Sequence, residues 1–267
     1  MADDAPRRDG VVRVQVARGV MTVTLTDLEN RNALGAGLVG GLREAIRVAN
    51  RDSSVRAVVV TNEGSTFCAG ANLKERSGAE KPKGGSDSGG LIELFRDIRT
   101  SPTPILGRIA GHAMGGGVGL AAVLDISIAA EDVKLGFTEV RLGVIPAMIS
   151  VVCLPKMRPG EAMEAFLRGN RFSAKRAVEL GLINRAVPAE ALDSAVEEVV
   201  ADLRKGGPNA LGLAKRLVYE VPGRESSDAF AWTAALSNEL FAGDEAKEGM
   251  AAFLGKRAPA WAEADET

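Results

Sequence analysis

Three consecutive glycines lie where an apolar strand would pass into a helix. They belong to the stretch Gly111–Gly119, which follows the apolar run Ile105–Ile109 and leads into the apolar run Val118–Leu124. Glycines at such a junction let the backbone approach another group closely, and they leave the first amide N–H groups of the helix uncovered. A helix start favours negative charge, so the stretch is suited to hold an anion, or an oxygen that becomes negative during a reaction. A tight turn that needs glycine only for packing is the alternative.

A second stretch has the same order of features. Phe67–Glu75 follows the apolar run Val55–Thr61 and contains small residues directly after the expected strand, then polar ones. Two loops of this kind are able to present one backbone N–H each to a single oxygen atom.

Four motifs together resemble those of the crotonase superfamily, the enoyl-CoA hydratases and isomerases. In chain order they are Asn30–Leu34, Phe67–Lys74, Gly111–Gly117 and Phe137–Pro146. The likeness is clear over residues 11–184 and looser beyond them. It implies an α/β fold, in which a crotonase-like spiral of ββα repeats is followed by a C-terminal helical region used in oligomerisation. The implied assembly is a homotrimer or a hexamer.

The resemblance also implies roles for individual residues. The backbone N–H groups of Ala71 and Gly116 would form an oxyanion hole for the thioester oxygen when an enolate develops. Glu139 matches a catalytic carboxylate of the family, and an apolar acyl chain beside it would raise its pKa toward working pH. The alternative for Glu139 is a surface side chain paired with Arg141.

The same resemblance assigns coenzyme A to the first two motifs, and the arginine and lysine among the matching residues suit phosphate. The matching residues are Arg31, Ala33, Ala69, Asn72, Leu73 and Lys74.

Gly119 departs from the family pattern. The standard hydratase has a second glutamate here, three residues after the oxyanion glycine, and glycine supplies no acid or base. Glu75 and Asp87 are two carboxylates that could replace it, and nothing in the sequence favours either. The surrounding residues resemble a branch that also has glycine, which includes hydratase-like proteins of branched unsaturated acyl-CoA degradation.

The nominal reaction is therefore hydration of a 2-enoyl-CoA, with Glu139 handling the proton. Isomerisation of a 3-enoyl-CoA to the 2-enoyl form is the first alternative, because one carboxylate suffices to move a proton from C2 to C4. An acyl-CoA-binding or scaffold protein without turnover is the second. Coenzyme A would be part of the substrate, and no separate cofactor is expected. His112 and Cys68 are interpreted as structural, since no second histidine exists to activate the thiol.

Composition excludes several other classes. The 267 residues are 46% hydrophobic, which is enough for a large core, and a net charge of −2 gives no basic surface for nucleic acid. No apolar run is long enough to cross a membrane. The single histidine removes most kinds of metal site, and none is predicted. Two cysteines make no disulfide framework, so we expect a cytoplasmic protein.

Residues 1–10 are polar and predict a disordered tail. The change from strand–helix repeats to helices alone indicates a second region that begins near residues 185–188. The resemblance implies that residues 11–187 form the crotonase core and that residues 188–267 form a C-terminal helical trimerisation region. The segment Ser77–Gly90 has a low-complexity composition and is either a lid or a surface insertion.

Strand and helix patterns alternate up to Pro146, and only helices are expected after it. The expected strands are 11–16, 21–25, 55–60, 105–109, 125–129 and 133–137, and the expected helices are 37–49, 91–98, 118–124, 161–167, 174–180, 191–203, 209–218, 228–240 and 245–254.

Overall fold

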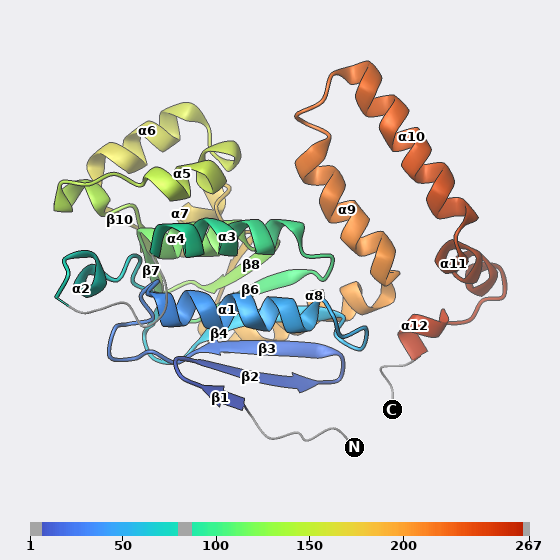
Figure 1. Ribbon diagram of the computed structural model, residues 1–267, viewed down its shortest axis with the longest axis horizontal. Helices are drawn as coiled ribbons and strands as arrows, with labels where there is room; N and C mark the ends of the chain where they lie inside the picture. The colour runs from blue at the N-terminus through green and yellow to red at the C-terminus, as the bar shows by residue number, and fades with distance from the viewer. Residues whose placement is uncertain (1–6, 80–86, 264–267) are drawn as a thin grey trace.

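The computed structural model describes residues 7–79 and 87–263, and its centre is a seven-stranded sheet (Figure 1). The strand order is β1-β2-β3-β4-β6-β8-β11. The first three strands pair antiparallel, and each neighbouring pair from β3 onward is parallel. These strands are β1 (Arg7–Asp9), β2 (Val12–Ala17), β3 (Val20–Leu25), β4 (Ala57–Asn62), β6 (Ile105–Ile109), β8 (Ile126–Ala130) and β11 (Arg185–Val187).

Helices cover the parallel strands, which explains their continuous apolar sequences. Every residue of β4 is buried, as expected for a strand packed on both faces. Helix α1 (Ala36–Ala49) buries one stripe of its surface and packs beside α3 (Asp87–Thr100). Helix α8 (Leu192–Lys205) packs against β4, β6 and β8.

A second, four-stranded sheet has the order β10-β9-β7-β5. Strands β5, β7 and β9 each follow a strand of the large sheet directly and are followed by a helix or 3₁₀ turn, which makes a repeat of two strands and a helix. Because β5, β7 and β9 are parallel, the loops that leave them emerge at one edge of this sheet. The strands are β5 (Thr66–Cys68), β7 (His112–Met114), β9 (Lys134–Gly136) and β10 (Arg171–Ser173).

Helices make up most of the rest of the described chain. Figure 1 shows α9 and α10 extending away from the sheets, with α11 and α12 leading back. No residue of α9 or α10 is buried. The remaining helical segments are α2 (Leu73–Arg76), α4 (Gly116–Val123), η1 (Glu139–Leu142), α5 (Ala147–Cys153), η2 (Leu154–Lys156), α6 (Pro159–Arg168), α7 (Ala174–Glu179), η3 (Ala189–Ala191), α9 (Pro208–Glu220), α10 (Ser226–Ala242), α11 (Asp244–Leu254) and α12 (Ala260–Glu263).

The chain end is fastened to the core through a buried arginine. Arg56 donates hydrogen bonds to the carbonyls of Trp261 at 2.8 Å and Gly206 at 2.7 Å, and the Trp261 indole donates to the Lys205 carbonyl at 3.1 Å. Both ends of the α9–α11 excursion are thereby held against the sheet. Among the described residues, no helix is both long and apolar enough to span a membrane.

Three sequence expectations need correction. Strands do not stop at Pro146, because β10 pairs with β9 and β11 pairs with β8. Arg7–Asp9 pairs with β2, so residues 7–9 of the expected tail are a strand, and residues 1–6 lie outside the described residues. The helix expected at 91–98 begins at Asp87. Residues 80–86 of the candidate lid also lie outside the described residues.

Candidate active site

Two glycine-containing loops meet at the edge of the small sheet. Gly70 has φ +94°, and a Cβ on it would lie 2.7 Å from the Met114 carbonyl oxygen and 3.1 Å from the Gly116 amide nitrogen. A Cβ on Gly117 would collide with the carbonyl oxygen of Cys68. The glycines after β5 and β7 are therefore required for contact between the two loops.

This contact places two free amides next to each other. A Cβ on Gly116 would lie 3.6 Å from the amide nitrogen of Ala71. Gly116 is the first residue of α4, where an amide has no partner within the helix. Neither amide donates a hydrogen bond to another described residue. The pair is suited to bind one oxygen atom, and the start of α4 favours negative charge there.

Glu139 lies against the same glycine turn. It begins the 3₁₀ turn after β9, and its Oε1 is 3.1 Å from the position of a Cβ on Gly115. The Oε2 atom is buried and has no hydrogen-bond partner among the described residues. Burial raises the pKa of the carboxyl, and a hydrogen bond from its own backbone amide offsets part of this.

The alternative interpretation of Glu139 does not fit the structure. Within residues 7–79 and 87–263 no ion pair joins it to Arg141, and Arg141 does not influence the pKa of its carboxyl. The Arg141 guanidinium instead reaches the carbonyl of Arg168 at 3.5 Å. Glu139 therefore stays available for proton transfer.

The other side of the α4 start is apolar. A Cβ on Gly119 would collide with the side chain of Ile149, whose Cβ is 2.7 Å away, and would lie 3.4 Å from Cζ of Phe95. Both side chains are buried. The space that a side chain at position 119 would need is filled by α5.

Glu75 does not replace the missing carboxylate. Its Oε2 accepts a hydrogen bond from the amide of Ala36 at 3.2 Å, which caps the start of α1. Asp87 is the first residue of α3, and its side chain lies outside the described part of the chain.

His112 and Cys68 have structural positions. The Nδ1 atom of His112 accepts a hydrogen bond from the amide of Lys134 at 3.0 Å, which links β7 to β9. Cys68 is fully buried, and burial raises the pKa of its thiol to about 12. Among the described residues, no group of His, Cys, Asp and Glu side chains is arranged to hold a metal ion.

The residues expected to contact coenzyme A also come together. The amide of Ala69 donates to the carbonyl of Arg31 at 3.1 Å, and the amide of Leu34 donates to that of Gly70 at 2.7 Å. These bonds join the first motif to the second, with Ala33 buried next to the junction. The Arg31 side chain is exposed beside them.

Asn72 explains the local shape of the second motif. Its side-chain oxygen accepts hydrogen bonds from the amides of Lys74 at 3.1 Å and Glu75 at 3.4 Å, which caps the short helix α2. Leu73 and Lys74 are thereby held on the exposed side of α2. Asparagine is among the residues that cap a helix start best, so Asn72 accounts for the start of α2 at Leu73.

Sequence reasoning missed Phe95 and Ile149 as neighbours of the site. Both looked like ordinary core residues, and α5 was not among the expected helices. The signal that could have found them is Gly119 itself, because a glycine inside a buried helix leaves space that another side chain must fill.

Comparison with known proteins gives a consistent result. A family model described as "Enoyl-CoA hydratase/isomerase" matches residues 15–264. A Thermus thermophilus protein provisionally named an enoyl-CoA hydratase is 36% identical over 253 residues, which cover 92% of this chain and 99% of the relative. Enoyl-CoA hydratase EchA19 of Mycobacterium tuberculosis is 31% identical over 246 residues, covering 90% and 91%.

Solved structures agree with the sequences. An enoyl-CoA hydratase of Mycobacterium smegmatis superimposes with a TM-score of 0.86 at 28% identity, covering 95% of this chain and 99% of that one. AtuE of Pseudomonas aeruginosa superimposes with a TM-score of 0.87 at 31% identity, covering 95% and 100%. Similarity of this extent includes both sheets and the C-terminal helices.

Proposed function

Because the chain belongs to the enoyl-CoA hydratase/isomerase family, we propose that it adds water to the double bond of a 2-enoyl-CoA thioester. The expected crotonase fold is confirmed by the solved relatives. The names of the relatives support hydration. The observation that carries the proposal is the Glu139 carboxyl beside the Gly115 turn, with one buried oxygen that lacks a partner among the described residues.

In the proposed mechanism, the thioester oxygen lies between the amides of Ala71 and Gly116. Water attacks C3 while Glu139 accepts one of its protons, and the electron pair of the double bond moves toward the thioester oxygen. The two N–H groups stabilise the resulting enolate. Glu139 then gives the proton to C2, so one water molecule is added and the carboxylate is regenerated. A raised pKa brings the carboxyl closer to the working pH for both steps.

Coenzyme A enters as part of the substrate, and the mechanism uses no separate cofactor. We assign its binding to the two joined motifs, where Arg31 and Lys74 are suited to phosphate. The amide of Ala69 is already used within the loop junction, so its contact with the ligand would be through the side chain or carbonyl. The full assigned set is Arg31, Ala33, Ala69, Asn72, Leu73 and Lys74.

Isomerisation of a 3-enoyl-CoA to the 2-enoyl form is the second candidate, and one observation favours it. Ile149 fills the space at Gly119 from which a second carboxylate would act in a standard hydratase. One carboxylate is enough for isomerisation, since Glu139 would remove a proton from C2 and return it at C4.

The C-terminal helices support a proposed assembly into a homotrimer or hexamer. Several large apolar side chains of α10 and α11 are exposed, among them Phe230 at 74% and Phe253 at 84%. Such patches mark interaction surfaces. Light scattering on the purified protein tests this, and a monomer with intact C-terminal helices would contradict it. The cytoplasmic location expected from the two cysteines also remains a prediction.

One assay tests the reaction itself. Purified wild type and Glu139→Gln would be incubated with matched 2-enoyl-CoA and 3-enoyl-CoA esters, and the products separated by mass. A product heavier than a 2-enoyl substrate by one water supports hydration. Conversion of the 3-enoyl ester without a mass change, and without hydration, supports isomerisation. Tight binding without turnover of any ester would support a non-catalytic acyl-CoA-binding protein.

A further inference from the structure

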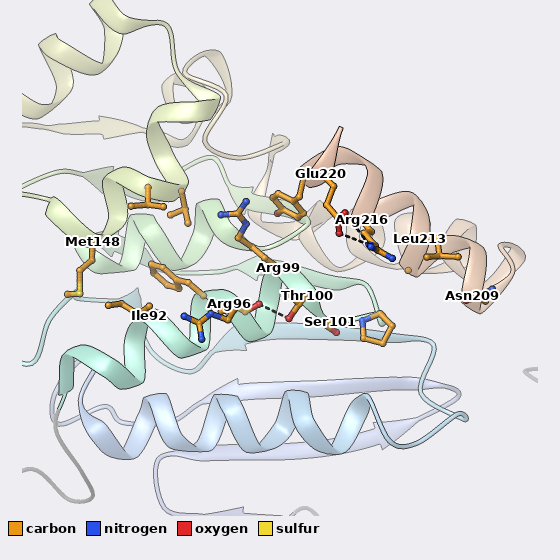
Figure 2. Close-up of a pocket in the computed structure, with 16 residues that line it drawn as sticks. Ile92, Arg96, Arg99, Thr100, Ser101, Met148, Asn209, Leu213, Arg216 and Glu220 are labelled. Carbon is orange, nitrogen blue, oxygen red and sulfur yellow. Dashed lines mark hydrogen bonds and ion pairs between the residues drawn. The ribbon is translucent and has the colours of Figure 1, made fainter. Parts of the chain in front are cut away.

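A groove lies between α3, α5 and α9 (Figure 2). Its volume is about 820 Å³. Most of its lining is apolar and comes from three helices, with Ile92 and Phe95 on α3, Met148 and Val152 on α5, and Leu213 on α9. We call it the α3–α9 groove.

This groove is separated from the start of α4 by two side chains. Phe95 and Ile149 both lie against the position of a Cβ on Gly119, and Phe95 also lines the groove. Gly119 follows Gly115 by about one helical turn, and Gly115 lies against the Glu139 carboxyl. Phe95 thus borders both the apolar side of this turn and the groove, so an acyl chain that passes Gly119 would reach the groove by displacing the Phe95 ring.

Arg99 lies partway along the groove and carries a charge without a carboxylate partner among the described residues. Its guanidinium carbon is 4.4 Å from the centroid of the Tyr219 ring on α9. Stacking uses the flat face of a guanidinium and leaves its in-plane N–H groups able to donate. Arg216, which lines the groove from α9 itself, differs because its guanidinium is paired with Glu220 at 3.3 Å.

Arg96 also lines the groove and provides an internal comparison on the same helix. It pairs with Glu93 at 2.9 Å, and its side chain is 62% exposed. Figure 2 shows Arg96 pointing away from α9, whereas Arg99 extends toward it. The groove thus combines apolar walls with one half-buried guanidinium whose donors are free for an acceptor.

We propose that the α3–α9 groove binds the part of the acyl chain that is remote from the thioester. Arg99 would bind a carboxylate at the far end of that chain. The preferred substrates would be CoA thioesters of long dicarboxylic acids, with the second acid group free. This inference rests on the proposed function, since it concerns the substrate of the same site. Charge complementarity supports the carboxylate, because a methyl end would leave the Arg99 donors without an acceptor in an apolar setting.

Kinetics with paired substrates test this inference. The 2-enoyl-CoA and 3-enoyl-CoA esters would be made at a series of even chain lengths, each ending in a methyl group or in a carboxylate. We expect wild type to prefer the carboxylate end, by kcat/KM, at the chain lengths that reach Arg99. Arg99→Met should reduce that preference roughly ten- to hundredfold, the range for a hydrogen bond to a charged group. Arg96→Met is the matched control and should keep it.

Several results would overturn the inference. One is a kcat/KM for methyl-ended esters that equals or exceeds that for carboxylate-ended esters at every chain length. Another is a preference for carboxylate-ended esters that is unchanged in Arg99→Met. The third is a loss of this preference in Arg96→Met as large as the loss in Arg99→Met. Arg99→Gln would replace Arg99→Met if thermal unfolding shows that the methionine variant is misfolded.

Binding separates this inference from the proposed reaction. If no ester is turned over, the proposed function fails, and calorimetry with saturated CoA esters then tests the groove alone. Tighter binding of the carboxylate-ended esters, reduced in Arg99→Met and kept in Arg96→Met, would support the groove assignment. Equal binding of the two kinds of ester would reject it.

Discussion

The two sides of the first turn of α4 differ in chemistry although the same glycine-rich backbone forms both. On one side, Glu139 places a half-buried carboxyl with a raised pKa against Gly115. On the other side, Gly119 faces only carbon among its nearest neighbours, from Ile149 and Phe95. The polar side can move a proton, whereas the apolar side can only exclude water and guide an acyl chain.

This difference indicates that the site depends on one proton carrier. A standard two-carboxylate arrangement would need an ionisable group on both sides of the turn. Here the second side is closed by α5, so any water that adds to substrate must be activated from the Glu139 side. Substitutions on the two sides should therefore have unequal consequences.

Glu139→Gln should have the largest effect, because it removes the only carboxyl that we place at the reacting carbons. We expect kcat to fall by about 10²–10⁴, the usual contribution of a positioned acid or base. KM should change little, since glutamine keeps the shape. Steady-state kinetics would measure this, with Glu164→Gln on the exposed surface of α6 as the control. Undiminished activity in Glu139→Gln would refute the mechanism.

Gly116→Val should have the second largest effect on rate, because its side chain would block the approach of the thioester oxygen to the amides of Ala71 and Gly116. The new side chain would meet Leu34 Cδ1 at 2.9 Å and lie 3.6 Å from the Ala71 amide nitrogen. Loss of one oxyanion donor costs about 10²–10³ in rate. Gly40→Val is a suitable control, since a Cβ on Gly40 meets nothing within 4 Å. Full activity in Gly116→Val would exclude this pair of amides as the oxyanion hole.

Sequence patterns predicted the polar side of the turn better than the apolar one. The glycines and Glu139 belong to short motifs whose chemistry can be read locally. The long strands and most helices were also predictable, because β4 begins with four consecutive apolar residues and α1 has a regular buried stripe. Local pattern and final structure agree wherever one element buries its own face.

Features that depend on distant partners were not predictable in this way. Strands β5, β7, β10 and β11 have three residues each, too few to show a period of two. They exist because neighbouring strands supply their hydrogen bonds. The position of Ile149 likewise depends on how α5 packs against α4, which no single segment specifies.

Gly119→Glu tests the apolar side and should change stability more than rate. The sequence alone suggests a gain in hydration, but a Cβ at this position collides with Ile149. Overpacking of this kind costs typically about 1–3 kcal/mol, and the added carboxylate would also lie among apolar groups. Urea unfolding would measure the loss. In the double variant with Ile149→Ala, much of the stability should return and the rate of hydration should rise. Wild-type stability in the single variant would show that position 119 is not filled.

The smallest effect is a pH-dependent gain in stability when Glu139 is neutralised. Its pKa is raised above the ordinary value of 4.5, so the folded state binds the proton more tightly than the unfolded state does. Wild-type stability must then fall as pH rises from 4.5 through the raised pKa, and level off above it.

Glu139→Gln lacks this fall, so it should be more stable than wild type at neutral pH by an amount that shrinks as the solution is acidified toward pH 4.5. The gain should be small because the side chain is only half-buried and water screens it. Denaturant unfolding of both proteins across this pH range would measure the difference. A Glu139→Gln variant that is less stable than wild type at neutral pH would mean that the carboxylate is stabilised by its surroundings, which would contradict a raised pKa and the role of Glu139 as a proton carrier.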